Sequence, residues 1–142
     1  MCSGGPGVVS LDRTAGGPPA LRVSPVNPYQ RIVTGLTNLL SRGPQQLEVG
    51  PPLEIDEPEG QTSVDVALYD TYGTTDLESD VRLLCGRADV DHVIVLAAET
   101  NPSMEAVVLA AGADAVVSKL QSSTDLFASI IAAGNRRWNG DR

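Results

Sequence analysis

Short apolar runs alternate with stretches of helical spacing from residue 21 onward, and this alternation limits the possible fold more than any other feature of the sequence. Runs with few polar residues predict buried strands, whereas apolar residues that recur every three or four positions predict amphipathic helices. The predicted strands are residues 21–26, 46–49 (or instead 53–55), 64–69, 92–97 and 115–118. Because strands that alternate with helices form parallel βαβ units, we predict an α/β fold with a doubly wound, five-stranded parallel sheet.

Four segments have the periodicity of amphipathic helices, and each begins at residues that favour a helix start. The predicted start signals are Asn27 with Pro28, Thr75 with Glu78, Asn101 with Pro102, and Ser122 with Asp125. The first helix is expected over residues 29–41, and Gly112 and Gly134 are expected to end the last two helices. Residues 50–63 contain three prolines, so we expect no full helix there.

Length and composition indicate one globular domain with an irregular segment at each end. Residues 1–20 are rich in glycine and proline and are predicted to be a disordered tail. Residues 21–134 form the predicted domain, and residues 135–142 are predicted to be a polar C-terminal tail. The formal net charge of −8 argues against nucleic-acid binding by this segment, because contact with phosphates needs a basic face.

Membrane and secretion signals are not found in this sequence. No apolar run approaches the roughly 20 residues that a membrane-spanning helix needs, and the N-terminus lacks the layout of a signal peptide. The two cysteines, Cys2 and Cys85, do not suggest a disulfide framework. We therefore expect a cytoplasmic protein without membrane contact.

Ligands of doubly wound sheets bind beyond the carboxyl ends of the strands, so the residues there are candidate site residues. The residues at these ends are Asn27 and Pro28, Asp70 and Thr71, Ala97, and Lys119. A carboxylate such as Asp70 can act as a nucleophile toward a phosphoryl group if a cation lies nearby. Lys119 is expected to approach Asp70 across the sheet edge and to supply that cation. The alternative interpretation is that Asp70 is a solvated loop aspartate.

Other polar residues give weaker signals. His92 begins a predicted strand, and because no second histidine accompanies it, a structural or surface role is favoured over metal ligation. The acidic residues within 54–59 lack the spacing of a calcium loop, so we expect a solvated loop and no metal site there. Trp138 is expected to cover the last helix or to mark an interface.

Four segments resemble the receiver domains of bacterial response regulators, especially those of the LuxR type. These segments are LRVSPVNPYQRIVTGLTNLL, VDVALYD, HVIVLAAE and AAGADAVVSKL, and the similarity extends over residues 21–133 in the expected order. The sequence LYDTYG is similar to that of atypical receivers in actinobacterial regulators. The resemblance implies a flavodoxin-like, CheY-like fold in which the second helix is degenerate.

The resemblance also implies roles for the residues at the strand ends. Asp70 falls at the position of the phospho-acceptor, and Lys119 falls at that of the lysine that contacts the phosphoryl group. Asn27 and Pro28 replace the acidic pair that binds magnesium, and Ala97 replaces a serine or threonine that senses the phosphate. Because magnesium prefers anionic oxygens in octahedral geometry, we expect weak or absent magnesium binding and no other cofactor.

Three functions are consistent with these residues. The first is a non-enzymatic signalling and protein-interaction module, an atypical receiver with a depleted phosphorylation pocket that forms the regulatory part of a transcription regulator. The second is a phosphorylation-competent receiver of a two-component phosphorelay that uses Asp70. The third, a small enzyme with Asp70 as nucleophile, ranks last, because Tyr72 stands where such phosphatases carry a second acid. The expected partners are a sensor kinase or another regulator, and a second copy bound through the face of the fourth helix, fifth strand and fifth helix.

Overall fold

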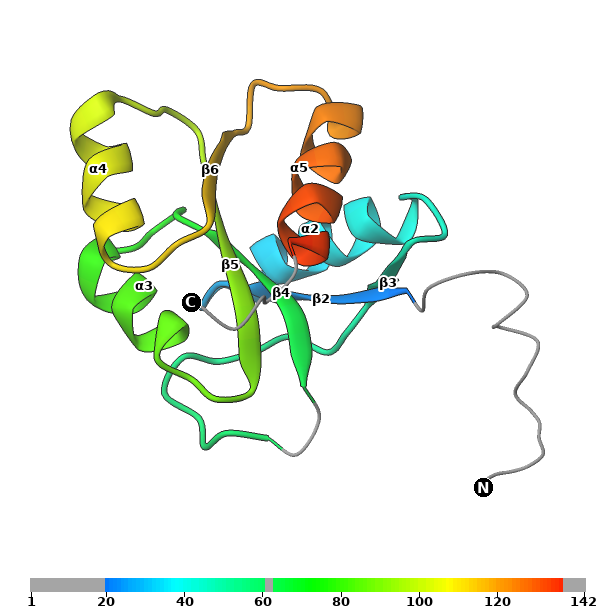
Figure 1. The fold of residues 1–142 in the computed structure, drawn as a ribbon, viewed down its shortest axis with the longest axis horizontal. Helices are drawn as coiled ribbons and strands as arrows, with labels where there is room; N and C mark the ends of the chain where they lie inside the picture. Colours follow the sequence, from blue (N-terminus) through cyan, green and yellow to red (C-terminus); the bar gives the residue numbers. More distant parts are fainter. Residues whose placement is uncertain (1–19, 61–62, 137–142) are drawn as a thin grey trace.

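A parallel sheet of five strands runs through the centre of the molecule (Figure 1). The computed structural model describes residues 20–60 and 63–136. Its strands are β2 (Leu21–Val26), β3 (Leu47–Val49), β4 (Val64–Asp70), β5 (Val90–Ala97) and β6 (Ala115–Ser118), in the spatial order β3-β2-β4-β5-β6. Every neighbouring pair is parallel, which confirms the predicted doubly wound α/β sheet. The second strand is the earlier of the two alternatives.

Helices cover both faces of this sheet (Figure 1). α2 (Gln30–Ser41) and α5 (Ser123–Asn135) pack on one face, where Leu40 and Ile130 are buried. α3 (Leu77–Cys85) and α4 (Pro102–Ala110) pack on the other, where Val81 and Val108 are buried. No helix within the described residues is long and apolar enough to span a membrane.

Strand β4 explains why the sequence in this region has few polar residues. Val66 and Leu68 belong to the apolar cluster beneath α2 and α5, whereas Ala67 and Tyr69 belong to the cluster beneath α3 and α4. Successive side chains of a strand point to opposite faces, so a central strand covered on both sides needs apolar residues at every position. Asp70 is the last residue of this buried strand.

The helix starts confirm some predicted caps and correct others. Asn101 and Ser122 cap α4 and α5, as predicted, by accepting hydrogen bonds from the amides of Met104 and Asp125. The predicted cap Thr75 is wrong by one residue, because Asp76 accepts the bond from the amide of Ser79 at the start of α3. Both residue types can cap a helix, so the sequence pattern alone did not separate them.

Two further boundaries differ from the prediction. Asn27 does not cap the first helix, since Tyr29 occupies the N-cap position of α2 and makes no side-chain cap bond. Gly134 does not end α5, which continues to Asn135. Gly112, with a φ of +119°, does follow α4 as predicted, in a conformation that suits glycine. The predicted tails lie almost wholly outside the described residues, as does Trp138.

The connection between β3 and β4 contains no helix in its described residues, 50–60 and 63, as predicted from its prolines. Its conformation depends on Arg87, which follows α3. The Arg87 guanidinium donates hydrogen bonds to the carbonyl oxygens of Ile55 (3.2 Å), Glu57 (2.8 Å) and Pro58 (3.3 Å). It also forms a buried ion pair with Asp89, with 2.9 Å between Nε and Oδ1. This loop, called the Arg87-bound loop below, is therefore held against the sheet from the α3 side.

Candidate functional site

The carboxyl ends of β2, β4, β5 and β6 meet at one edge of the sheet, and the candidate residues gather there. Within the sheet, the chain runs from β2 outward to β3 and then crosses back to β4, so the strand order reverses between β2 and β4. Such a reversal point is where doubly wound sheets bind their ligands. Asn27 follows β2 and Asp70 ends β4, so both residues lie at this point.

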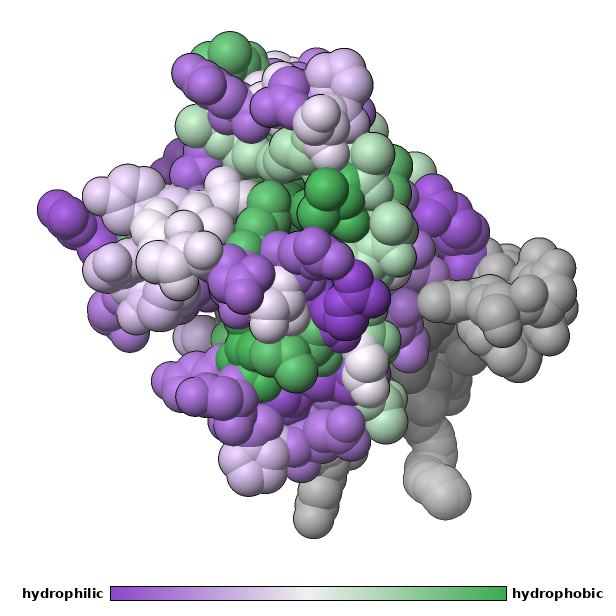
Figure 2. Space-filling model, turned by 90° about the vertical axis from the view of Figure 1, so that its left-hand side faces the viewer, coloured by the Kyte–Doolittle hydropathy of each residue, from purple (hydrophilic) through white to green (hydrophobic). Residues whose placement is uncertain are grey.

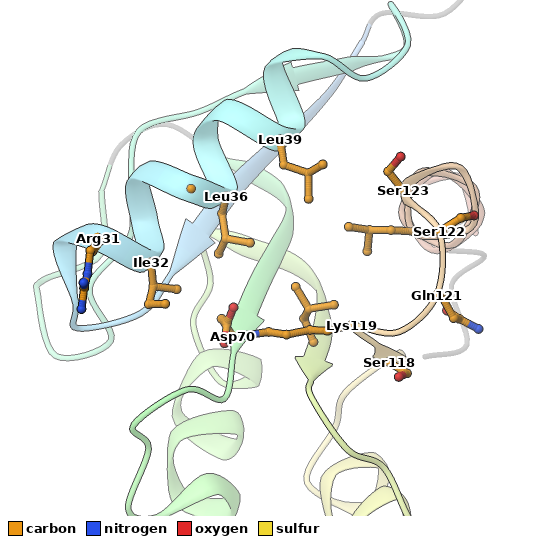
Figure 3. Close-up of a pocket in the computed structure, with 13 residues that line it drawn as sticks. Arg31, Ile32, Leu36, Leu39, Asp70, Ser118, Lys119, Gln121, Ser122 and Ser123 are labelled. Carbon is orange, nitrogen blue, oxygen red and sulfur yellow. Dashed lines mark ion pairs between the residues drawn. The ribbon is translucent and has the colours of Figure 1, made fainter.

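Asp70 and Lys119 form the ion pair that the sequence predicts. The Lys119 ammonium lies 2.9 Å from Asp70 Oδ1, and Figure 3 shows its side chain extended across the sheet edge toward the carboxylate. The Asp70 side chain is only 3% exposed, whereas that of Lys119 is 32% exposed. Asp70 Oδ1 also accepts a hydrogen bond from the backbone amide of Tyr72 (2.8 Å). The alternative of a solvated loop aspartate is therefore wrong, because the carboxylate is buried and bonded from two sides.

Asn27 uses its whole amide group to hold the neighbouring strand end. Its Nδ2 donates to the carbonyl oxygens of Asp70 (2.8 Å) and Tyr72 (3.0 Å), and its Oδ1 accepts from the amide of Tyr29 (2.9 Å). The side chain is buried and links the end of β2 to the segment that follows β4. This structural link replaces the helix-capping role that the sequence pattern indicated.

The remaining candidates take different positions around the pair. Ala97 is buried at the end of β5, where it lies beside Ser118 of β6, and it offers a methyl group without a hydrogen-bond donor. The backbone amide of Thr71 donates to the carbonyl of Leu96 (3.0 Å). Pro28 is exposed and has no side-chain ligand atom. Pro28, Thr71 and Ala97 are not among the residues that line the cavity beside Asp70 and Lys119, and Pro28 lies with Asn27 at a second pocket.

The loop after β4 is fixed by contacts that the sequence analysis missed. The hydroxyl of Tyr69 donates to Oδ2 of Asp80 (2.6 Å), and the hydroxyl of Thr74 donates to the same oxygen (2.9 Å). Burial is the main reason why the pKa of Tyr69 lies well above its usual value. Asp80 belongs to α3, so these bonds tie the loop to that helix.

Two tyrosines hold the same loop from the other side. The rings of Tyr29 and Tyr72 meet edge to face, with 5.6 Å between their centroids. Gly73 lies beneath them with a φ of +74°, and a Cβ atom at this position would collide with the Tyr29 ring. The glycine is therefore required both by its backbone conformation and by the ring above it. The run Tyr72-Gly73 was the available sequence signal for a tight turn here.

The weaker candidates of the sequence analysis lie away from this edge. His92 is buried in β5, and its Nδ1 lies 3.3 Å from Oδ1 of Asp114. Within residues 20–60 and 63–136, no three His, Cys, Asp or Glu side chains gather closely enough to hold a metal ion. Glu59 of the acidic stretch accepts a hydrogen bond from the backbone amide of Ala88 (3.1 Å), so that loop is partly engaged with the rest of the domain.

Comparison with known proteins identifies the architecture. No protein-family model and no curated protein matches the sequence. Among solved structures, the signal receiver domain of the response regulator NarL from Mycobacterium tuberculosis is 18% identical, with a TM-score of 0.64 over 84% of this chain and 100% of that chain. A LuxR family DNA-binding response regulator from Silicibacter pomeroyi is 19% identical, with a TM-score of 0.65 over 80% of this chain and 91% of that chain.

This chain has the receiver-domain fold. A pilus assembly protein, CpaE, from Burkholderia thailandensis shares it at 12% identity, with a TM-score of 0.67 over 80% of this chain and 97% of that chain. The flavodoxin-like, CheY-like architecture expected from the sequence is thus confirmed, and the described part of the chain has four helices around the five strands. In this receiver fold, Asp70 and Lys119 lie together at the strand ends, while Asn27 is used to fasten the loop after β4.

Proposed function

We propose that this domain is an atypical receiver that regulates through protein contacts, with little or no phosphorylation at Asp70. The observation that carries the proposal is that all three side-chain hydrogen bonds of Asn27 are made to the backbone. We propose, from the resemblance to receivers, that this residue stands at the position of an acidic side chain that would help to bind magnesium. Here the position supplies a structural clamp in place of a negative charge.

Magnesium does not fit the residues at this edge. The ion requires near-octahedral oxygen ligands and is usually bound through one or two carboxylates. Asp70 supplies a carboxylate whose Oδ1 is already 2.9 Å from the Lys119 ammonium. Asn27 Oδ1 accepts the amide of Tyr29, and Pro28 has no side-chain ligand atom. The donor set therefore supports the proposal of weak or absent magnesium binding.

Phosphoryl transfer has little support from the remaining residues. Its charge must be neutralised by metal ions and by positioned donors. Lys119 offers one cation, but Ala97 has no hydroxyl that could donate to a phosphoryl oxygen. A domain with this pocket is better suited to a regulatory role through its surface than to catalysis, so we propose that it is not an enzyme.

Its partners are proposed to be proteins. The candidates are a sensor kinase, another regulator, or a second copy bound through the α4–β6–α5 face. Protein partners are consistent with the receiver fold, and the net charge of −8 disfavours nucleic acid. The LuxR family neighbour is described as a DNA-binding response regulator, which supports a regulatory part in a cytoplasmic transcription regulator.

The second candidate is a receiver that still accepts a phosphoryl group on Asp70. The contact of 2.9 Å between Asp70 and Lys119 favours it, because a nucleophile and a cation remain adjacent. A phosphoryl group would add about two negative charges and would draw Lys119 toward it. That change would be transmitted through the loop that Asn27 holds.

A magnesium titration followed by NMR tests the proposal. We expect the amide signals of Asn27 and Asp70 to show no saturable change up to millimolar concentrations of the ion, because too few anionic oxygens face the edge. The amide of exposed Asn38 on α2 serves as the reference for non-specific salt effects. Saturable shifts at low millimolar magnesium that are confined to Asn27 and Asp70 would contradict the proposal.

A further inference from the structure

A cavity of about 420 Å³ opens between α2 and α5, beside the Asp70–Lys119 pair (Figure 3). Most of its wall is apolar: Ile32, Leu36 and Leu39 come from α2, Leu96 from β5 and Leu126 from α5. Figure 3 shows Leu36 and Leu39 of α2 directed into the space that faces the β6–α5 connection, with Arg31 at the other end of the cavity. Cavities that bind small molecules have volumes of roughly 300–1,000 Å³, mainly apolar walls and a few polar groups that fix orientation.

The polar groups of this cavity carry a surplus of positive charge. Lys119 and Asp70 both line it and compensate each other as an ion pair. Arg31, near the start of α2, lines it as well, and within the described residues its guanidinium has no carboxylate partner. Of the two cations, Arg31 is therefore available to an anionic group of a ligand, and the one-third exposed Lys119 lines the same cavity.

Gly35 keeps the cavity open. It lies in the middle of α2 and lines the cavity, and a Cβ atom built at this position meets no heavy atom within 4 Å. Glycine lowers helix stability relative to alanine, so a side chain would suit the helix better here. Any larger side chain at position 35 would extend into the cavity.

We propose that this cavity binds a small amphipathic anion, with its apolar body between α2 and α5 and its anionic group at Arg31. The inference deepens the proposed function, since it rests on a receiver whose state is set by something other than phosphate. The ligand would lie beside the Asp70–Lys119 pair, and the backbone of Asp70 is joined to Asn27 and the loop beyond it. A ligand that binds one arrangement of this loop better than another shifts the population of the domain.

Two fluorescent probes test the site: 8-anilinonaphthalene-1-sulfonate, an aromatic body with one negative charge, and its neutral analogue N-phenyl-1-naphthylamine. We expect both to bind the wild-type protein. Gly35→Leu should weaken both by about tenfold or more because it fills the cavity. Arg31→Gln should weaken the sulfonate by about two- to fivefold, the size of one exposed ion pair, and leave the neutral probe unchanged.

The matched control is Asn38→Leu, which adds the same side chain to an exposed position of α2 outside the cavity. It should bind both probes as the wild type does. Gly35→Met, with a more flexible side chain, replaces Gly35→Leu if circular dichroism shows that the latter is unfolded. The proposal is overturned if the wild type binds neither probe, if the filled variant binds as tightly as Asn38→Leu, or if Arg31→Gln weakens both probes equally. The magnesium titration does not depend on this cavity, so the two proposals can fail separately.

Discussion

Asn27 donates two hydrogen bonds that a carboxylate at the same position could not donate. Its Nδ2 reaches the carbonyl oxygens of Asp70 and Tyr72, and an aspartate would place a negative charge against both of them. At the scale of single residues, the neutral amide at position 27 is therefore what allows this structural link. An aspartate at this position would have to break both bonds.

We expect Asn27→Asp to lower the free energy of unfolding by about 1–3 kcal/mol, because one buried and one part-buried acceptor lose their donor and face a charge. Asn27→Ala should lower it by a similar amount. Urea denaturation of both variants measures this, with Asn38→Ala, an exposed asparagine of α2, as the control that should change little. An Asn27→Asp variant as stable as the wild type would show that the hydrogen bonds of Asn27 do not contribute to the free energy of unfolding.

At the scale of elements, the sequence predicted the strands and loops whose structure depends on a local residue pattern. The sequence correctly predicted strands β2, β4, β5 and β6 and the proline-rich connection. Apolar runs and prolines determine the local structure of the residues that contain them. The Asp70–Lys119 pair was also predictable, since parallel strands bring their carboxyl ends to one edge. Helix boundaries were less accurate, because Thr75 and Asp76 can both cap a helix.

Contacts between distant segments could not be predicted from pattern. Arg87 binds carbonyl groups that lie about thirty residues earlier in the chain, and nothing in its own neighbourhood indicates this. The same is true of the two bonds that Asn27 donates, whose acceptors lie more than forty residues later. Such bonds are determined by the folded arrangement, whereas the sequence signals a cap or a strand only through near neighbours.

The Arg87-bound loop should depend strongly on its ion pair. Arg87→Met removes the partner of Asp89, whose side chain is 7% exposed, and leaves a buried charge uncompensated. We expect the free energy of unfolding to fall by about 3 kcal/mol. Arg82→Met, on the exposed side of α3, should change it by no more than about 0.5 kcal/mol. Equal effects in both variants, measured by urea denaturation, would mean that the loop is held by other contacts.

Acid should weaken the same contact. The hydrogen bond from Arg87 is the main cause that lowers the pKa of Asp89 below its usual value of 3.8. A carboxyl group with a lowered pKa in the folded state stabilises the protein above its unfolded pKa, and this contribution is lost as the pH falls through the folded value. Stability should therefore decrease below about pH 4, and less steeply in Asp89→Asn than in the wild type. Parallel slopes for the two proteins would contradict this assignment.

At the scale of the whole molecule, the side formed by α3 and α4 presents apolar residues to solvent. Figure 2 shows this side, where apolar patches lie among polar residues. Val107 and Leu109 of α4 are 41% and 47% exposed, whereas Val108 between them is fully buried. Substitution of Val108 would therefore disturb the core, and Val107 is the better position at which to test the α4–β6–α5 face.

Val107→Asp should weaken self-association, because a charge would be placed in the proposed contact, and should leave the free energy of unfolding within about 0.5 kcal/mol. Leu83→Asp, at an exposed leucine of α3, is the matched control and should not weaken it. Analytical ultracentrifugation and urea denaturation together separate an interface effect from a folding effect. Unchanged association of a folded Val107→Asp variant would exclude this position from the interface.

The central claim is that this receiver fold no longer depends on a phosphoryl group at Asp70. Wild-type protein and Asp70→Asn, which retains an acceptor for the Tyr72 amide, should be incubated with acetyl phosphate and magnesium and their intact masses measured. A conventional receiver treated in parallel shows that the reagent is active. Our account predicts that neither protein gains the mass of a phosphoryl group. A wild-type protein that gains this mass beside an unmodified Asp70→Asn variant would contradict it.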